Sequence, residues 1–423
     1  MDRTESIEVG AARKSNLPIL KWTVFLVIAS FLAWHIVIIN LSDHYARQYD
    51  IEKAAAALAW YPEHPRGLFK RGLQLTETNS QQAEIMLRKA AEENPTNGYN
   101  YMVLALLAEA RGDVKKASNL MTAADFLSPM RSTVQLGAAE FWMRRGEMDE
   151  AIKHLSVALE LRPQIRESLY PNLLRLADNP STRPTFGVLL KEPPSWWESF
   201  FAYAAVNSPR LDTLRTLYQM RSQSAQKPTV DERRLYVKRL QDEKLWLDAY
   251  FVWLDGLDAN QLAQLGNVYN GNFELPLTNE GFGWRTPKAP GVLIETAPVY
   301  GATGSKALHV VFEGGGVHFR HLFQHLFLEP GDYRFLGRVQ TDNLQTSQGV
   351  QWVLKCVPDS ENVLGVSERF LGISQWRRFA TQFTVPAENC RVQELRLELV
   401  GRFKQEFEAS GGVWFDALSI NRL

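Results

Sequence analysis

The residues best suited to chemistry lie on one predicted strand, residues 321–330, with the sequence HLFQHLFLEP. Successive side chains of a strand point to opposite faces, so one face is mostly leucine and the other alternates imidazole and phenyl rings. The residues of this second face are His321, Phe323, His325 and Phe327. Sugar rings stack on aromatic faces, and imidazoles hydrogen-bond hydroxyl groups. The pattern predicts a glycan-binding surface, or alternatively a face packed against the helical part of the chain.

Catalytic chemistry has little support in the sequence. It contains no G-x-S-x-G elbow, no phosphate-binding loop and no H-E-x-x-H motif. A zinc site fails on geometry, because His321 and His325 would be about 13 Å apart on a strand and His318 would face the other way. The 47 Lys and Arg balance the 47 Asp and Glu, which argues against a nucleic-acid partner. We therefore expect a protein that is not an enzyme and requires no cofactor.

One apolar run determines where these residues lie. Residues 22–41, WTVFLVIASFLAWHIVIINL, contain no Asp, Glu, Lys or Arg. As a helix the run is about 30 Å long, the thickness of the hydrocarbon core of a bilayer. It predicts one transmembrane helix. A cleaved signal peptide is the alternative, but the run is longer than the usual signal core and no small-x-small site follows it.

The charges around the run predict its orientation. Arg3, Arg13, Lys14 and Lys21 precede it, and the next basic residue is Arg47. Lys and Arg are retained in the cytoplasm, so residues 1–21 are the expected cytoplasmic tail. We expect the rest of the chain to lie in the periplasm, anchored in a bacterial inner membrane.

The two cysteines, Cys356 and Cys390, then predict a disulfide. The periplasm is oxidising, and two cysteines allow only one pairing within the chain. Both lie at the ends of predicted strands, where adjacent strands of a sandwich can bring them together. The alternative is a pair of buried free thiols.

Residues 42–265 show a 34-residue period. The first window has Tyr101, Leu104, Ala105, Ala108, Gly112, Ala117, Ala124 and Pro129 in register, and the second has Gln135, Ala138, Ala139, Trp142, Gly146, Ala151, Ala158 and Pro163. This pattern resembles the tetratricopeptide repeat, which implies an all-α array of about five helix pairs. We expect the membrane helix to run straight into it. Such a stack leaves a concave groove for a protein partner, and the alternative function is that of a spacer.

From Asn270 onwards, short alternating strands replace the helical period. They are predicted at residues 308–313, 321–330, 333–340, 350–357, 376–385, 393–401 and 412–420, and the glycines of residues 314–316 are expected to form a turn. The motifs NGNFE (270–274), GFGWR (281–285) and VWFDALSI (413–420) occur in the order found in carbohydrate-binding modules of the family 4/9/22 type. This resemblance implies an all-β jelly-roll sandwich over residues 268–423, without catalytic activity. The four tryptophans Trp284, Trp352, Trp376 and Trp414 are expected in its core.

The same resemblance implies a structural calcium ion near the first and last strands. The matching carboxylates are Glu274 and Asp416, with backbone carbonyls completing the oxygen ligands. The alternative is two ordinary carboxylates at strand ends.

The expected fold is thus multidomain: a transmembrane helix at 22–41, a helical repeat array at 42–265 and a jelly roll at 268–423. The combination suggests a non-enzymatic, membrane-anchored scaffold in exopolysaccharide or envelope-glycan assembly or export, in which the array binds protein and the jelly roll binds polysaccharide. The alternative is a scaffold for a protein complex, with no glycan binding.

Overall fold

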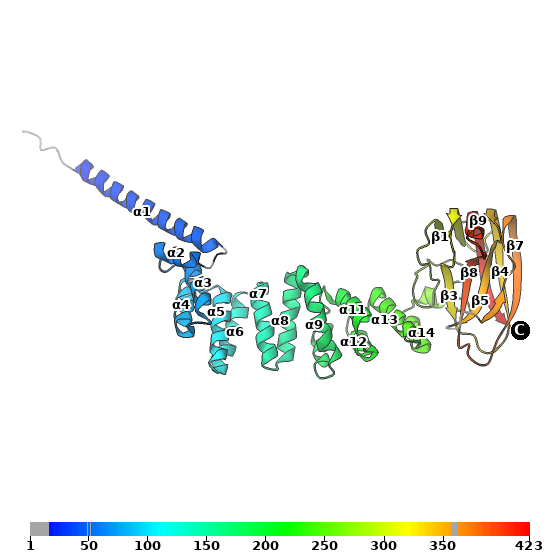
Figure 1. The fold of residues 1–423 in the computed structure, drawn as a ribbon, viewed down its shortest axis with the longest axis horizontal. Coiled ribbons are helices and arrows are strands. Elements are labelled where there is room, and N and C mark those ends of the chain that lie inside the picture. Colours follow the sequence, from blue (N-terminus) through cyan, green and yellow to red (C-terminus); the bar gives the residue numbers. More distant parts are fainter. Residues whose placement is uncertain (1–16, 49, 51, 358–361) are drawn as a thin grey trace, which may run out of the picture. The chain divides into compact units, whose positions relative to one another are not determined.

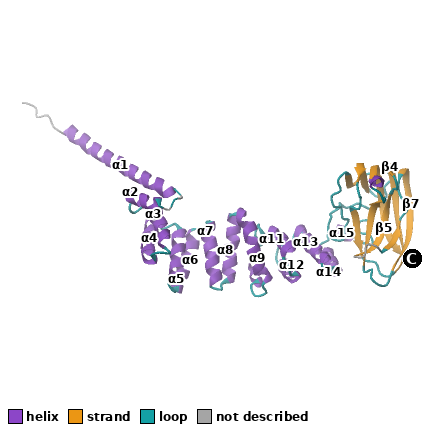
Figure 2. Ribbon diagram, viewed as in Figure 1, coloured by secondary structure: helices purple, strands orange, loops and turns teal. Residues whose placement is uncertain are grey.

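The computed structural model describes residues 17–48, 50, 52–357 and 362–423. The chain forms two compact units, Met1–Trp196 and Trp197–Leu423. The first unit is helical, whereas the second begins with helices and ends in a sandwich of two β-sheets (Figures 1 and 2). Residues 1–16 of the predicted cytoplasmic tail lie outside the described residues.

The first helix, α1 (Leu17–Arg47), contains the predicted membrane span and continues beyond it. Its segment Lys21–Arg47 is long and apolar enough to cross a membrane. Large apolar side chains such as Trp22 and Phe31 are about two-thirds exposed, so the protein itself does not cover them. A helix with these properties can serve as a membrane anchor or as a signal sequence.

The next helices form the predicted repeat array. They are α2 (Lys53–Trp60), α3 (Pro65–Leu75), α4 (Ser80–Glu93), α5 (Gly98–Ala110), α6 (Val114–Leu127), α7 (Ser132–Arg144) and α8 (Met148–Leu161). Gly112 and Gly146 make the α5–α6 and α7–α8 turns, with φ of +78° and +80° that favour glycine. Fully buried alanines such as Ala117 and Ala138 let the helices of each pair approach closely. The predicted 34-residue repeat is confirmed.

The array becomes less regular after α8. Helix α9 (Arg166–Asp178) contains Pro171, which lacks a backbone N–H, and α10 (Phe186–Leu190) is only five residues long.

The second unit begins with five helices: α11 (Trp197–Asn207), α12 (Leu211–Gln223), α13 (Val230–Asp242), α14 (Trp246–Asp255) and α15 (Ala259–Leu262). A capping box of Thr229 and Glu232 starts α13. Glu232 is fully buried and accepts hydrogen bonds from Arg221 Nε at 3.0 Å and Trp197 Nε1 at 2.5 Å. The buried Arg221–Glu232 ion pair joins α12 to α13, and the hydrogen bond from Trp197 adds α11. These hydrogen bonds compensate the buried charge of Glu232.

The sandwich has nine strands in the described part of the chain. They are β1 (Val292–Ala297), β2 (Ala307–Gly316), β3 (Leu322–Leu326), β4 (Gly331–Thr346), β5 (Val350–Val357), β6 (Val363–Val366), β7 (Gly372–Val385), β8 (Val392–Leu399) and β9 (Glu408–Arg422). One sheet has the order β1-β2-β9-β4-β7 and the other β3-β8-β5-β6, with antiparallel neighbours throughout.

The seven predicted strands are all present, and the structure adds β1 and β6. The prediction of a turn at residues 314–316 is wrong, because these glycines end β2 next to a bulge. Gly314 and Gly315 have φ of +96° and +99°, which lets the strand bend without ending the pairing.

The core lies between the sheets around Trp352, whose ring centroid is 5.2 Å from Phe415 and 5.6 Å from Trp284. Trp284 and Trp352 are almost completely buried, as predicted. The prediction was wrong for Trp376 and Trp414. Both are only half-buried and lie on the outer face of the five-stranded sheet, because strand alternation turns them away from the core.

The predicted disulfide is confirmed. Cys356, near the end of β5, is bonded to Cys390, just before β8, with the Cα atoms 5.1 Å apart. The disulfide links the residues just before β8 to β5, which is the neighbouring strand in the same sheet.

Candidate binding surfaces

The junction between α1 and α2 shows that the apolar helix continues into the first helix pair. Ser42 is fully buried, and its Oγ donates to the carbonyl oxygen of Ala57 on α2 at 2.8 Å. Asp43 lies 3.4 Å from the Arg66 guanidinium and 3.7 Å from His64, at the start of α3. The apolar helix α1 therefore packs directly on the first helices of the array, and its role as a membrane anchor stays a prediction.

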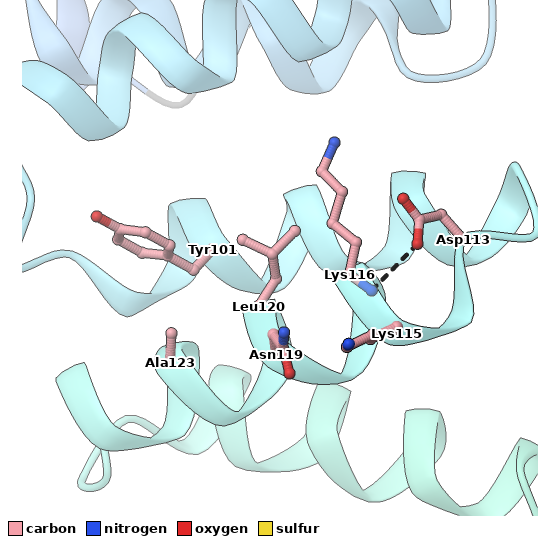
Figure 3. A pocket seen from close by; sticks show the side chains of 7 residues that line it. All are labelled: Tyr101, Asp113, Lys115, Lys116, Asn119, Leu120 and Ala123. Atoms are coloured by element: carbon pink, nitrogen blue, oxygen red, sulfur yellow. Dashed lines mark hydrogen bonds between the residues drawn. The ribbon is translucent and has the colours of Figure 1, made fainter.

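A groove runs between α4 and α6, with α5 as its floor. One part, of about 400 Å³, is lined by Tyr101, Asp113, Lys115, Lys116, Asn119, Leu120 and Ala123. Figure 3 shows its apolar side chains at one end and Asp113 with the two lysines at the other. An adjoining part of similar volume shares Tyr101, Lys116 and Leu120 and extends along α4 to Glu84 and Arg88. Together they form an open groove with an apolar floor and charged ends.

Glu84 organises the charges of this groove. Its carboxylate accepts hydrogen bonds from Arg88 on α4 at 2.7 Å, from Lys116 on α6 at 3.0 Å, and from Arg111 at the end of α5. The Arg88 hydrogen bond, supported by those of Lys116 and Arg111, lowers the pKa of Glu84 to about 2 although partial burial opposes this. The carboxylate thus stays ionised and joins three helices.

Sequence reasoning did not single out Glu84. Arg111 and Lys116 lie 27 and 32 positions away in the sequence, close to one repeat length. A search for opposite charges separated by about one repeat could have found them.

A second polar and aromatic surface follows the first helices of the repeats. The Tyr99 ring lies 4.8 Å from the Phe69 ring and 4.8 Å from the guanidinium carbon of Arg131, which also donates to Asn97. In the next repeat Arg144 donates to Glu109 at 2.7 Å. These contacts link successive repeats, and a protein partner in a concave groove stays a prediction.

The predicted glycan surface on β3 is divided into two halves. His325 and Phe327 are covered by α14: the Trp246 ring centroid is 5.0 Å from His325, and the Tyr250 ring centroid is 5.0 Å from Phe327. A cavity of about 340 Å³ remains beside them, between α14 and β3. His325 and Phe327 therefore pack against the helical part of the chain, which was the alternative to a glycan-binding surface.

His321 and Phe323 form the other half and are half-buried. The Arg396 guanidinium carbon lies 4.8 Å from the centre of the Phe323 ring, a cation–π contact. Glycan binding by all four residues stays a prediction.

The outer face of the β3-β8-β5-β6 sheet also holds buried charges. His325, Glu394 and Lys355 are neighbours across three strands, with His325 Nε2 3.6 Å from one carboxylate oxygen of Glu394 and Lys355 Nζ 3.6 Å from the other. Burial lowers the pKa of His325 to about 4, although Glu394 acts in the opposite direction. The buried His325 is therefore neutral at pH 7.

The carboxylates implied for calcium bind backbone amides of the β1–β2 loop, residues 298–306. Glu274 accepts from the Ser305 and Lys306 amides at 2.7 and 3.0 Å, and Asp416 accepts from the Thr303 amide at 2.5 Å. The other oxygen of each carboxylate also accepts a hydrogen bond, from Ser305 Oγ and the Ala417 amide respectively.

These contacts fit a loop-fixing role better than a calcium site. Arg338 lies 3.9 Å from Asp416 and supplies a positive charge beside the fully buried carboxylate. Within the described parts of the chain, no group of three or more His, Cys, Asp or Glu side chains could hold a metal ion. Two carboxylates with chain donors on every oxygen fit the six to eight oxygen ligands of calcium poorly.

Comparison with known proteins finds similarity only at the level of solved structures. No family model and no curated protein matches the sequence. A CBM4 structure is 12% identical, covers 37% of this chain and 99% of its own, and has a TM-score of 0.28. Yeast Tom70 is 18% identical over 52% of this chain and 42% of its own (TM-score 0.26), and Pseudomonas aeruginosa PilF is 18% identical over 46% and 90% (TM-score 0.24).

Proposed function

We propose that this chain is a non-enzymatic scaffold, anchored in a bacterial inner membrane, for exopolysaccharide or envelope-glycan assembly or export. The helical array binds a protein partner and the sandwich binds glycan in the periplasm. The observation that carries the proposal is the continuity of α1 with the first helix pair, through Ser42 and Ala57. A partner held by the array is thereby held at the membrane.

Two features support export of the bulk of the chain. The basic residues before the apolar segment favour a cytoplasmic N-terminus. The Cys356–Cys390 bond belongs to a class that persists in oxidising compartments such as the periplasm.

The α4–α6 groove is the proposed protein-binding surface. Tyr101 and Leu120 offer an apolar surface, and Lys115 offers a cation at one end. An extended or helical segment with apolar residues followed by acidic ones matches this arrangement. Replacing Tyr101 and Lys115 with Ala in the full chain should abolish capture of such a partner from detergent-solubilised membranes, whereas the same changes at Tyr300 and Lys288, in the sandwich, should not.

The alternative function is that of a protein-complex scaffold without glycan binding. It is favoured by one observation: Trp246 and Tyr250 of α14 cover half of the predicted glycan surface on β3. In that case the sandwich is a docking domain.

Co-sedimentation of the full-length protein with polysaccharide prepared from its host distinguishes the two functions. The proposal predicts that the protein pellets with the polysaccharide, and that Phe323→Ala weakens this while the fold survives. Phe327→Ala, beneath α14, reports on packing. Absence of co-sedimentation would favour the alternative. Unfolding by the Phe323 and Phe327 changes would assign that face to packing alone. Reproducible glycan hydrolysis by the purified protein would overturn the non-enzymatic assignment.

A further inference from the structure

Helix α2 folds back along the end of the apolar helix α1 (Figure 1). Only residues 48–52 separate the two helices in the sequence, and a connection this short makes antiparallel neighbours. The hydrogen bond from Ser42 Oγ to the carbonyl oxygen of Ala57 sets Ala57 level with Ser42. Ala46, one turn later in α1, and Ala54, about one turn earlier in α2, are both fully buried, as this antiparallel register requires.

The end of α2 therefore lies beside the apolar segment itself. Trp60 and Tyr61 follow Ala57 directly in the same turn, about 5–6 Å further along the helix axis. In the antiparallel register this distance brings them to the level of Ile38, which is half-buried. Ile38 belongs to the apolar segment 22–41, which is as long as the hydrocarbon core of a bilayer is thick. The last turn of this segment is thus covered on one side by α2.

Helix α3 runs back from this level. Arg66, at its start, lies 3.4 Å from Asp43 of α1, and Lys70, one turn later, donates to the carbonyl oxygen of Gln48. Later residues of α3 thus meet later residues of α1. The turn between α2 and α3, residues 61–64, is therefore directed towards the apolar segment.

The surface of α2 suits the boundary between water and lipid. After Lys53 the helix has no charged side chain and consists of alanines, one leucine and Trp60. Trp60 is 40% exposed, and Ala55 and Ala59 are exposed as well. Tryptophan and tyrosine are enriched at membrane–water interfaces, because one end of each side chain is apolar and the other end forms hydrogen bonds.

Two guanidinium groups lie near this end of α2. Arg47 Nε is 2.6 Å from Asp43, which also pairs with Arg66, and both arginine side chains are more than half exposed. A guanidinium has five N–H donors, so donors remain for the phosphate of a lipid. With Asp43 and the exposed Glu63, the four charges balance, which suits a zwitterionic headgroup layer.

We propose that α2 and residues 61–64 form a second contact with the bilayer that α1 spans. Trp60 and Tyr61 lie in the headgroup region, and Arg47 and Arg66 bind phosphate groups of the phospholipids. The occupant of this surface is lipid, because the exposed apolar side chains of α1 continue into the exposed side of α2 at the same level. The proposal rests on the membrane anchor of the proposed function. Its consequence is that the first helix pair of the array is seated on the bilayer and does not swivel about α1.

Spin labels on introduced cysteines test the contact in the full-length protein. The two native cysteines are bonded to each other, so an introduced cysteine is the one free thiol. Trp60→Cys and Ala59→Cys are labelled separately in liposomes of phosphatidylethanolamine and phosphatidylglycerol. Accessibility to oxygen and to a water-soluble nickel complex measures the depth of each label. We expect both labels within about 10 Å of the boundary between headgroups and acyl chains.

Two further positions provide the references. Phe126→Cys is the matched control, because Phe126 is an 82%-exposed aromatic residue on α6, and its label should remain in water. Leu32→Cys, in the middle of the apolar segment, should give the deepest label. Arg47→Gln should move the Ala59→Cys label towards water, whereas Arg47→Lys should leave it in place.

The other outcomes separate this contact from the anchor. A deep Leu32 label, with the labels at positions 59 and 60 as accessible to nickel as the control, would overturn the contact and leave the anchor standing. A Leu32 label in water would overturn the anchor and the contact with it. An unmoved label in Arg47→Gln would overturn the phosphate contact. A circular dichroism spectrum of each variant excludes unfolding as the cause of a shallow label.

Discussion

Glu84 is a case in which one side chain orders several elements. Three cations from α4, the end of α5 and α6 surround its carboxylate, and the side chain is 13% exposed. An ion-pair network of this kind contributes more to the free energy of unfolding than an isolated surface pair, because the charged partners are held together by more than one contact. It also fixes the shape of the groove that we propose for a protein partner.

We predict that Glu84→Gln lowers the free energy of unfolding by about 1 kcal/mol at pH 7. The pKa of Glu84 is lowered in the folded protein, so its stabilising contribution is complete above the unfolded value near 4.5. The contribution is lost as the pH falls from about 4.5 towards 2. Urea denaturation at pH 7 and pH 3 measures this. An equal difference between wild type and variant at both pH values would contradict the assignment.

His325 also makes the stability depend on pH, but over a higher pH range than Glu84. Burial lowers its pKa to about 4, whereas the unfolded chain takes up a proton near pH 6.5. Between these values the unfolded state binds more protons, so stability falls as the pH decreases.

We therefore predict that the second unit loses about 1–2 kcal/mol of stability between pH 7 and pH 5 through this histidine. His325→Gln should remove that part of the pH dependence, whereas His318→Gln, in the loop before β3, should retain it. Thermal denaturation followed by near-ultraviolet circular dichroism measures both. An unchanged pH dependence in His325→Gln would show that the side chain is accessible to solvent.

At the residue scale, sequence reasoning succeeded where only one arrangement was available. Two cysteines in the same predicted domain allowed only the Cys356–Cys390 pairing. It failed for Trp376 and Trp414, because composition does not tell which face of a strand is inside. It could not foresee that α14 covers His325 and Phe327, since Trp246 and Tyr250 are remote in sequence and belong to a helix.

Gly98 shows why the repeat array depends on small residues at particular positions. It begins α5, and a Cβ atom there would lie 2.3 Å from the backbone oxygen of Ala124 on α6. The backbone of a packed helix cannot move away as a flexible side chain can.

Gly98→Ala should consequently destabilise the first unit by about 1–3 kcal/mol. Gly187→Ala is the control, because Gly187 lies within α10 with open space around its Cβ position. The control should be neutral or stabilising by about 0.5–1 kcal/mol. Denaturant titration compares the two, and a neutral Gly98→Ala would contradict the close approach of α5 and α6.

At the element scale, the periodicity of the sequence predicted the repeated helix pairs and most of the strands. The 34-residue period located α5 to α8, and strand alternation located seven of the nine described strands. The short strand β6 was missed because four residues, VLGV, are too few to show alternation. Strand β1 was missed because it is an edge strand whose side chains, polar and apolar alike, are mostly half-buried.

The whole molecule has a definite expected topology. A reporter active only in the periplasm, fused after Leu423, should be active, because Lys and Arg before an apolar helix favour a cytoplasmic N-terminus. Replacing Arg13, Lys14 and Lys21 with Glu should reduce that activity. Activity of a cytoplasm-only reporter at the same position would contradict the export of both units.

The central claim is that one membrane-anchored molecule holds polysaccharide at the bilayer. Flotation of proteoliposomes carrying the full-length chain, mixed with fluorescent host polysaccharide, tests it most directly. We predict that the polysaccharide floats with the liposomes, and that a chain lacking residues 1–41 leaves it behind. Polysaccharide that stays at the bottom of the gradient, although the full-length protein floats, would contradict the claim.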